Sequence, residues 1–130
     1  MELNSEVPTA PPRDAATVVM LRDAPQGLEV FLVKRHGLSD VLGGAYVFPG
    51  GKLDTTDTQV DALSHLDHSP TDLHAELGEP DLDVPRAVGL YVAALREAFE
   101  ESGVLFVADA KAAATALAKG TPFNTILADL

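Results

Sequence analysis

Short apolar runs in the first 50 residues predict β-strands. Residues 15–21 (AATVVML) and 28–33 (LEVFLV) are largely apolar with β-branched side chains, and Pro25-Gln26-Gly27 lies between them. The two runs therefore predict a strand pair joined by a turn. A third short strand is expected over residues 45–48, ending at Pro49-Gly50-Gly51, where the chain is expected to turn sharply.

One long helix is the clearest element of the second half. Asp83 fits a helix cap and Pro85 fits a first turn. Residues 87–102 are rich in helix-forming residues, and Gly103 supplies a stop. A short strand is expected directly after this helix, over residues 104–107.

Two further helices are expected near the C-terminal end. An alanine-rich helix covers residues 109–119 and ends at Gly120, and Thr121-Pro122 opens the last helix. The last helix gathers its apolar residues on one face, namely Phe123, Ile126, Leu127 and Leu130. Because no later segment of the sequence offers a partner for this face, it favours a homodimer.

Two segments lack a sustained apolar pattern. Residues 1–13 combine prolines with polar residues and predict a flexible lead-in. Residues 52–83 are rich in Asp, Thr, His and Pro and predict a long surface excursion with one short helix near residues 71–77. Residues 14–130 are then expected to form one domain.

Composition narrows the class of protein. The chain of 130 residues is 46% hydrophobic and 22% charged, which suits one globular domain. It shows neither an apolar run long enough for a membrane helix nor a secretion signal, so no membrane partner and a cytoplasmic location are expected. It has no cysteine, which leaves oxygen and histidine as metal ligands.

The net charge restricts the partners. The 20 acidic and nine basic residues give a formal net charge of -11, which repels polyanions and disfavours nucleic acid. A carboxylate-rich site can hold a small phosphate ester only through bridging cations. An acidic chain and a phosphate-containing substrate are therefore compatible when a metal ion is present.

Three glutamates on the long helix form the candidate chemical site. Glu97, Glu100 and Glu101 stand at i, i+3 and i+4, so their carboxylates share one face within about 6 Å. A divalent cation would turn their mutual repulsion into coordination. Arg96 is placed to orient these ligands through hydrogen bonds. The alternative interpretation is an ordinary solvated acidic face.

The residues around these glutamates resemble the Nudix hydrolase family. The family signature is a glycine, five residues, a glutamate, seven residues, and then R-E-U-x-E-E-x-G-U with U aliphatic. Residues 96–104 (REAFEESGV) match the second half of this signature. The resemblance implies that Glu97, Glu100 and Glu101 bind Mg²⁺ or Mn²⁺ and that Arg96 orients them.

The upstream sequence Phe48-Pro49-Gly50-Gly51 fits the same family. By this resemblance Gly51 is the signature glycine, placed beside the substrate, and Gly50 lends a backbone carbonyl to the metal ion. The implied fold is α+β, an α/β/α sandwich with a mixed sheet. Because the resemblance covers about residues 15–107, the sheet is expected to lack its C-terminal part, as in a truncated piece or a chain that completes its core by association.

The signature is interrupted after its first half. The sixth residue after Gly51 is Asp57 rather than glutamate, and residues 58–95, instead of seven residues, separate Asp57 from Arg96. An insertion of about 31 residues therefore splits the motif. The sequence leaves open whether Asp57, Asp54 or neither aspartate lies close to the glutamates in the folded chain.

A subgroup that resembles coenzyme A diphosphatases carries such an insertion, and residues 32–51 are similar to its upstream segment. Arg35 and the spacing from Gly44 to Phe-Pro-Gly-Gly match its coenzyme A box, whereas the second arginine, expected near Asp40, is missing. Arg35 and Lys52 are the basic residues nearest the glycines and are candidates for contacts with substrate phosphates. Ordinary surface charge is the alternative for both.

The histidines of the insertion suggest a second, weaker hypothesis. A zinc site is conceivable from a subset of nearby side chains, namely His65, His68, His74, Asp61, Asp67 and Asp72. Plain solvent exposure is the alternative.

The expected reaction is Mg²⁺-dependent or Mn²⁺-dependent hydrolysis of a diphosphate linkage in a nucleoside diphosphate derivative, such as coenzyme A or its esters. Glu97 or Glu100 is a candidate general base, and the alternative is a base in the C-terminal part of the family's fold that this sequence is expected to lack. Two other functions stay open. One is a silent or truncated Nudix-like module that binds metal or nucleotide without turnover. The other is an acidic interaction domain with no ligand.

Overall fold

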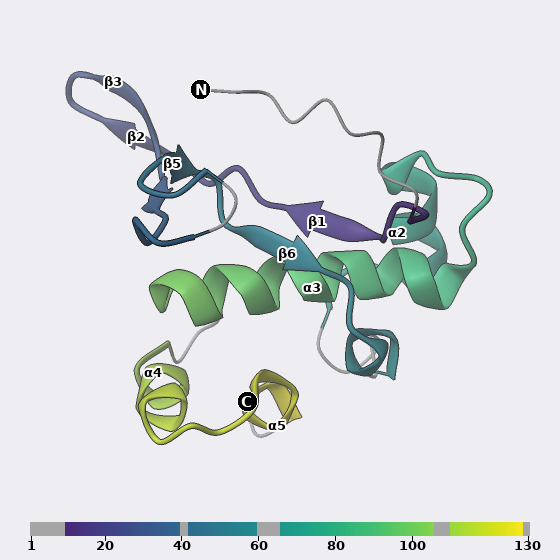
Figure 1. Cartoon of the computed structure of the whole chain (residues 1–130). Helices are drawn as coiled ribbons and strands as arrows, with labels where there is room; N and C mark the ends of the chain where they lie inside the picture. Colours follow the sequence, from purple (N-terminus) through teal and green to yellow (C-terminus); the bar gives the residue numbers. More distant parts are fainter. Residues whose placement is uncertain (1–9, 40–41, 60–65, 106–109, 129–130) are drawn as a thin grey trace.

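A computed structural model describes most of the chain, namely residues 10–39, 42–59, 66–105 and 110–128 (Figure 1). The expected lead-in lies outside the described residues as far as residue 9, and residues 10–13 that follow it are in neither helix nor strand. Among the described residues, no helix is both long enough and apolar enough to cross a membrane.

The strands form three separate antiparallel pairs within the described residues. The pairs are β1 (Ala15–Thr17) with β6 (Gly50–Lys52), β2 (Leu21–Ala24) with β3 (Gly27–Val30), and β4 (Val33–Lys34) with β5 (Tyr46–Val47). The mixture of strands and helices confirms the α+β class. The expected mixed sheet is not present, because every pair among these residues is antiparallel.

The first apolar run was expected to be one strand and is two. The turn at Pro25 is confirmed, because Ala24 pairs with Gly27 across it in the β2–β3 hairpin. The hairpin takes only Leu21 from the first run, however, and β1 pairs instead with β6. The prediction was wrong here because the partner of β1 lies far along the chain, beyond the reach of a local pattern.

The two glycines were expected to turn the chain, and they form strand β6 instead. A side chain on Gly50 would overlap the backbone oxygen of Ala16 on β1, and one on Gly51 would overlap the carboxylate of Glu97. The two glycines therefore allow strand β6 to lie close to β1 on one side and to the long helix on the other (Figure 1).

The long helix α3 (Val84–Ser102) begins and ends as predicted. The Asp83 side chain caps it by accepting the Arg86 N–H at 2.8 Å. Gly103 ends it in the left-handed conformation, with φ 74°, and donates its N–H to Phe99 at 2.7 Å. The expected strand that follows is not found at Val104 and Leu105, and its remainder lies outside the described residues.

Helix α3 is the centre of the fold, with the β1–β6 pair on one side and helices α4 (Ala110–Ala118) and α5 (Phe123–Ala128) on the other (Figure 1). The rings of Phe99 and Phe123 are 6.0 Å apart and pack in the buried core. The core also contains Leu73, Val88, Val92, Leu105, Ala113, Ile126 and Leu127.

The apolar face of α5 is therefore covered within the same chain. Phe123, Ile126 and Leu127 are at most 8% exposed, and Leu130 lies outside the described residues. Because these residues pack on the central helix, they are not an exposed face for a second copy, and the expected homodimer stays a prediction.

The described parts of the insertion, the 3₁₀ turn η1 (Thr55–Gln59) and the helix α2 (Pro70–Leu77), lie along the first half of α3. The predicted short helix is confirmed as α2, capped by Ser69, and η1 precedes it. Leu73 of α2 enters the core, and its carbonyl accepts the Tyr91 hydroxyl at 3.3 Å. The described ends of the insertion thus lie against the helix that carries the glutamates.

Candidate active site

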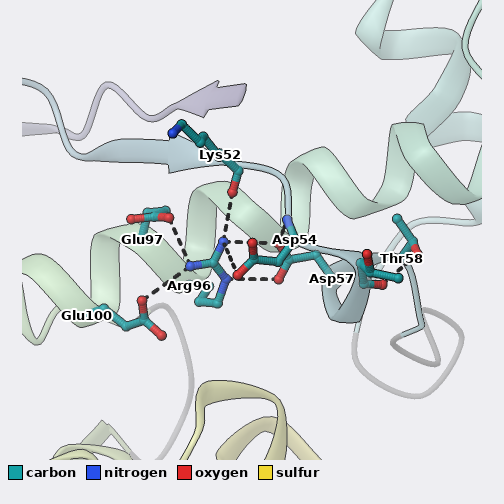
Figure 2. Close-up of polar contacts among 8 residues, drawn as sticks. Lys52, Asp54, Asp57, Thr58, Arg96, Glu97 and Glu100 are labelled. Carbon is teal, nitrogen blue, oxygen red and sulfur yellow. Dashed lines mark hydrogen bonds and ion pairs between the residues drawn. The ribbon is translucent and has the colours of Figure 1, made fainter. Parts of the chain in front are cut away.

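The guanidinium of Arg96 is the hub of the polar contacts on α3. Its Nε and Nη2 donate to the two carboxylate oxygens of Asp57 at 2.9 and 3.0 Å, which makes a bidentate ion pair (Figure 2). Arg96 is 7% exposed and Asp57 is fully buried. The hydrogen bonds that Arg96 donates to Asp57 raise the pKa of Arg96 above its ordinary value, so the guanidinium stays charged despite burial.

The 3₁₀ turn η1 holds Asp57 in place. The Asp57 N–H donates to the Asp54 carbonyl at 3.0 Å, and the Asp54 N–H donates back to Asp57 Oδ2 at 2.9 Å. The Asp54 carboxylate lies 3.8 Å from Arg96 and is 65% exposed. Of the two aspartates left open by the sequence, Asp57 therefore makes the close contact, while Asp54 lies at the edge.

Two of the three glutamates also bind Arg96. Nη1 donates to Glu97 Oε1 at 2.9 Å and to Glu100 Oε2 at 3.2 Å, and Figure 2 shows these two residues across the guanidinium from Asp57. Nη2 donates in addition to the backbone carbonyl of Lys52 at 3.0 Å. One buried cation thus holds the helix, strand β6 and the start of the insertion together.

The glycine strand lies directly over the glutamate face. The Gly50 N–H donates to Glu101 Oε2 at 3.3 Å. The bare Cα of Gly51 leaves the space that the Glu97 carboxylate occupies. A side chain at Gly51 would therefore displace the carboxylate of Glu97, a candidate ligand.

A metal ion implied by the resemblance can be tested against this arrangement. Within the described part of the chain, no three His, Asp or Glu side chains form a group that could hold a metal ion. The expected convergence of the three glutamates is absent because two of them bind Arg96 and the third binds the Gly50 N–H. The donors are nevertheless of the right chemical type, since adjacent carboxylates are what Mg²⁺ and Mn²⁺ prefer.

The two basic residues proposed for substrate phosphates lie apart from this cluster. The Lys52 side chain is exposed and extends away from Arg96, which its carbonyl contacts (Figure 2). Arg35 shapes a loop through its backbone: its N–H donates to Ala45 at 2.9 Å, and its carbonyl accepts from Gly44 at 3.2 Å. Asp40, the site of the missing second arginine, lies outside the described residues.

The histidines of the insertion do not assemble a site in the described residues. His68 pairs with Asp67 at 2.8 Å on the surface, and Asp72 binds the cap Ser69. His74 lies on α2, while the other two candidate zinc ligands, His65 and Asp61, lie outside the described residues.

The contact that the sequence left undecided is the return of Asp57 to Arg96. A usable signal was present, because Asp57 occupies the sixth position after Gly51, where the Nudix signature has its glutamate. The involvement of the Lys52 carbonyl had no signal, since a backbone oxygen leaves no trace in the sequence.

An Arg-Glu-x-x-Glu-Glu helix packed beneath a Gly-Gly strand defines the Nudix class of domains, and comparison with known proteins supports this class. The family model for the NUDT19 Nudix domain matches residues 9–125. The chain belongs to this family.

The chain is similar to two curated relatives that are described as acyl-coenzyme A diphosphatase NUDT19. The protein from Xenopus laevis is 30% identical over 96 residues, which cover 61% of this chain and 25% of the relative. The human protein is 31% identical over 102 residues, which cover 63% of this chain and 27% of the relative. The chain therefore spans about a quarter of the length of these relatives.

A solved structure supports the same fold. The chain is similar to the crystal structure of a NUDIX hydrolase from Alicyclobacillus acidocaldarius, with a TM-score of 0.53 and 31% sequence identity. The similarity covers 76% of this chain and 40% of that protein.

Proposed function

We propose that the chain is the Nudix domain of a diphosphatase that hydrolyses the diphosphate linkage of coenzyme A or an acyl-coenzyme A. The observation that carries the proposal is the glutamate face of α3, packed beneath the Gly-Gly strand and organised by Arg96. The names of the two curated relatives support the choice of substrate.

The metal dependence is part of this proposal. Glu97, Glu100 and Glu101, with the carbonyl of Gly50, would hold Mg²⁺ or Mn²⁺. When bound, such a cation supplies positive charge against the diphosphate oxygens and acidifies the attacking water. In this proposal Glu97 or Glu100 is the general base that accepts a proton from the attacking water.

Arg96 acts on these ligands as a positioning group. Its Nε and Nη2 are held from behind by Asp57 and the Lys52 carbonyl, which leaves Nη1 facing Glu97 and Glu100. The guanidinium therefore keeps the carboxylates of Glu97 and Glu100 beside each other when they are not otherwise bound. Such outer contacts orient metal ligands and support their affinity.

A second function has one observation in its favour. Arg96 already neutralises Glu97 and Glu100, so these two carboxylates are satisfied without a metal ion. A module that binds nucleotide without turnover could keep the site in this state. The two functions differ in one measurable quantity, the rate of hydrolysis.

The test is mononucleotide release from coenzyme A, octanoyl-coenzyme A, ADP-ribose and NADH, each with Mg²⁺ or Mn²⁺. Turnover that is lost in Glu100→Gln and kept in Glu79→Gln would support the proposal, because Glu79 is an exposed acid outside the site. Equal turnover in both variants would overturn the role of the glutamate face. No turnover, with Mn²⁺ binding still seen by calorimetry, would favour the binding module.

A further inference from the structure

The β2–β3 hairpin and the residues that flank it carry an unusual amount of exposed apolar surface. Leu21, Leu28, Val30, Phe31 and Leu32 are between 38% and 62% exposed. Single exposed apolar residues are ordinary, whereas a contiguous group indicates a binding surface. The hairpin is therefore a candidate for contact with an apolar ligand.

Part of this surface borders a groove of about 470 Å³. The groove is lined by Met20, Leu21, Arg22, Glu29, Val30, Phe31 and Val104. Arg22 Nε and Glu29 Oε2 are 2.6 Å apart, so the two charged members of the lining neutralise each other. The other members are apolar, and the volume lies within the roughly 300–1,000 Å³ that is usual for ligand pockets.

The chain connects the groove to the glutamate face on two sides. On the helix side, Val104 follows Glu101 by three residues, directly after the end of α3. On the strand side, the Val18 N–H donates to the Pro49 carbonyl at 2.9 Å. Val18 lies two residues before Met20 of the groove, and Pro49 directly precedes Gly50. Gly50 in turn donates to Glu101, so a short path leads from the groove to the candidate ligands.

We propose that this groove binds the acyl chain of an acyl-coenzyme A whose diphosphate lies at the glutamate face. The proposal rests on the proposed function and adds the place of the acyl chain. In a substrate of this kind the pantetheine arm joins the charged diphosphate to an apolar acyl tail, and the structure links a carboxylate site to an apolar groove through the contacts of Val18 and Gly50. Closing the groove over a tail would also remove the exposed side chains of Leu21 and Val30 from water.

The test measures binding without hydrolysis. The full chain is titrated by calorimetry with coenzyme A and with its butanoyl, hexanoyl and octanoyl thioesters, all with Ca²⁺ in place of Mg²⁺, so that a cation can still bridge the diphosphate to the carboxylates. Each added methylene that enters the groove should tighten binding by up to about fourfold, because burial of a methylene is worth about 0.8 kcal/mol. In Val30→Asp the gain in affinity for each added methylene should be much smaller. Leu28→Asp is the matched control, since Leu28 lies on the same strand but outside the groove lining.

Several outcomes would overturn the assignment. One is equal affinity for coenzyme A and octanoyl-coenzyme A. Another is that Leu28→Asp reduces the dependence of affinity on chain length as much as Val30→Asp does. A dimer that Val30→Asp dissociates, with acyl-chain dependence unchanged, would assign the groove to a second copy of the chain. Leu21→Asp repeats the test from the other strand if Val30→Asp fails to fold. Failure of the proposed function is distinct, since it shows as no hydrolysis of coenzyme A with Mg²⁺ while the dependence on chain length persists.

Discussion

Neutralising Asp57 should destabilise the fold far more than neutralising its neighbour Asp54. Asp57→Asn keeps the size of the side chain but removes the negative charge that faces the buried guanidinium of Arg96 at 2.9 and 3.0 Å. Removing one partner of a buried ion pair typically costs about 3–5 kcal/mol, because the other charge is left unpaired. Arg96 keeps Glu97, Glu100 and the Lys52 carbonyl, so we expect a smaller cost of about 2 kcal/mol.

The assay is urea unfolding followed by far-UV circular dichroism. A loss of about 2 kcal/mol should move the midpoint down by roughly 1 M urea for a chain of this size. Asp54→Asn is the matched control, because the Asp54 carboxylate is 65% exposed and 3.8 Å from Arg96, and it should cost less than about 0.5 kcal/mol. The reasoning fails if Asp57→Asn unfolds within about 0.5 kcal/mol of the parent chain, or if the two variants lose the same stability.

Three further predictions address the site and the insertion. Gly51→Ala should displace the Glu97 carboxylate and weaken Mn²⁺ affinity by about tenfold in calorimetry. Unchanged affinity would show that Glu97 is not a metal ligand. Ser69→Ala should lower the free energy of unfolding by about 1 kcal/mol in urea, since it removes the cap of α2, and a cost near zero would mean that this helix is already frayed. Asp67→Asn should lower the pKa of His68, because the carboxylate of Asp67 accepts a hydrogen bond from the imidazole and raises that pKa. An unchanged titration midpoint of His68 by NMR would show that this surface pair does not form in solution.

Local signals in the sequence predicted the helices well. The start of α3 at Asp83 and its end at Gly103 each depend on a side chain or a glycine next to the helix itself. The spacing of Glu97, Glu100 and Glu101 likewise fixes one helical face without reference to the rest of the fold.

The errors of sequence reasoning share one physical cause, which is that the missing partner is distant along the chain. Strand β1 pairs with β6 rather than with its neighbour. The apolar face of α5 packs on Phe99 rather than on a second copy. Neither of these pairings leaves a periodic pattern in the sequence.

The Asp57–Arg96 pair shows that the Nudix signature here is a spatial motif rather than a fixed count of residues. Lengthening the connection between the two halves about fivefold costs only about 1.5 kcal/mol in loop-closure entropy. Leaving Arg96 without Asp57 is expected to cost about 2 kcal/mol, which exceeds this entropy, and the docking of Leu73 on α3 also favours the closed arrangement. A chain can therefore gain a segment of this length inside its catalytic motif and still bring the acid to the guanidinium, so motif searches that require seven residues at this point will pass over such domains.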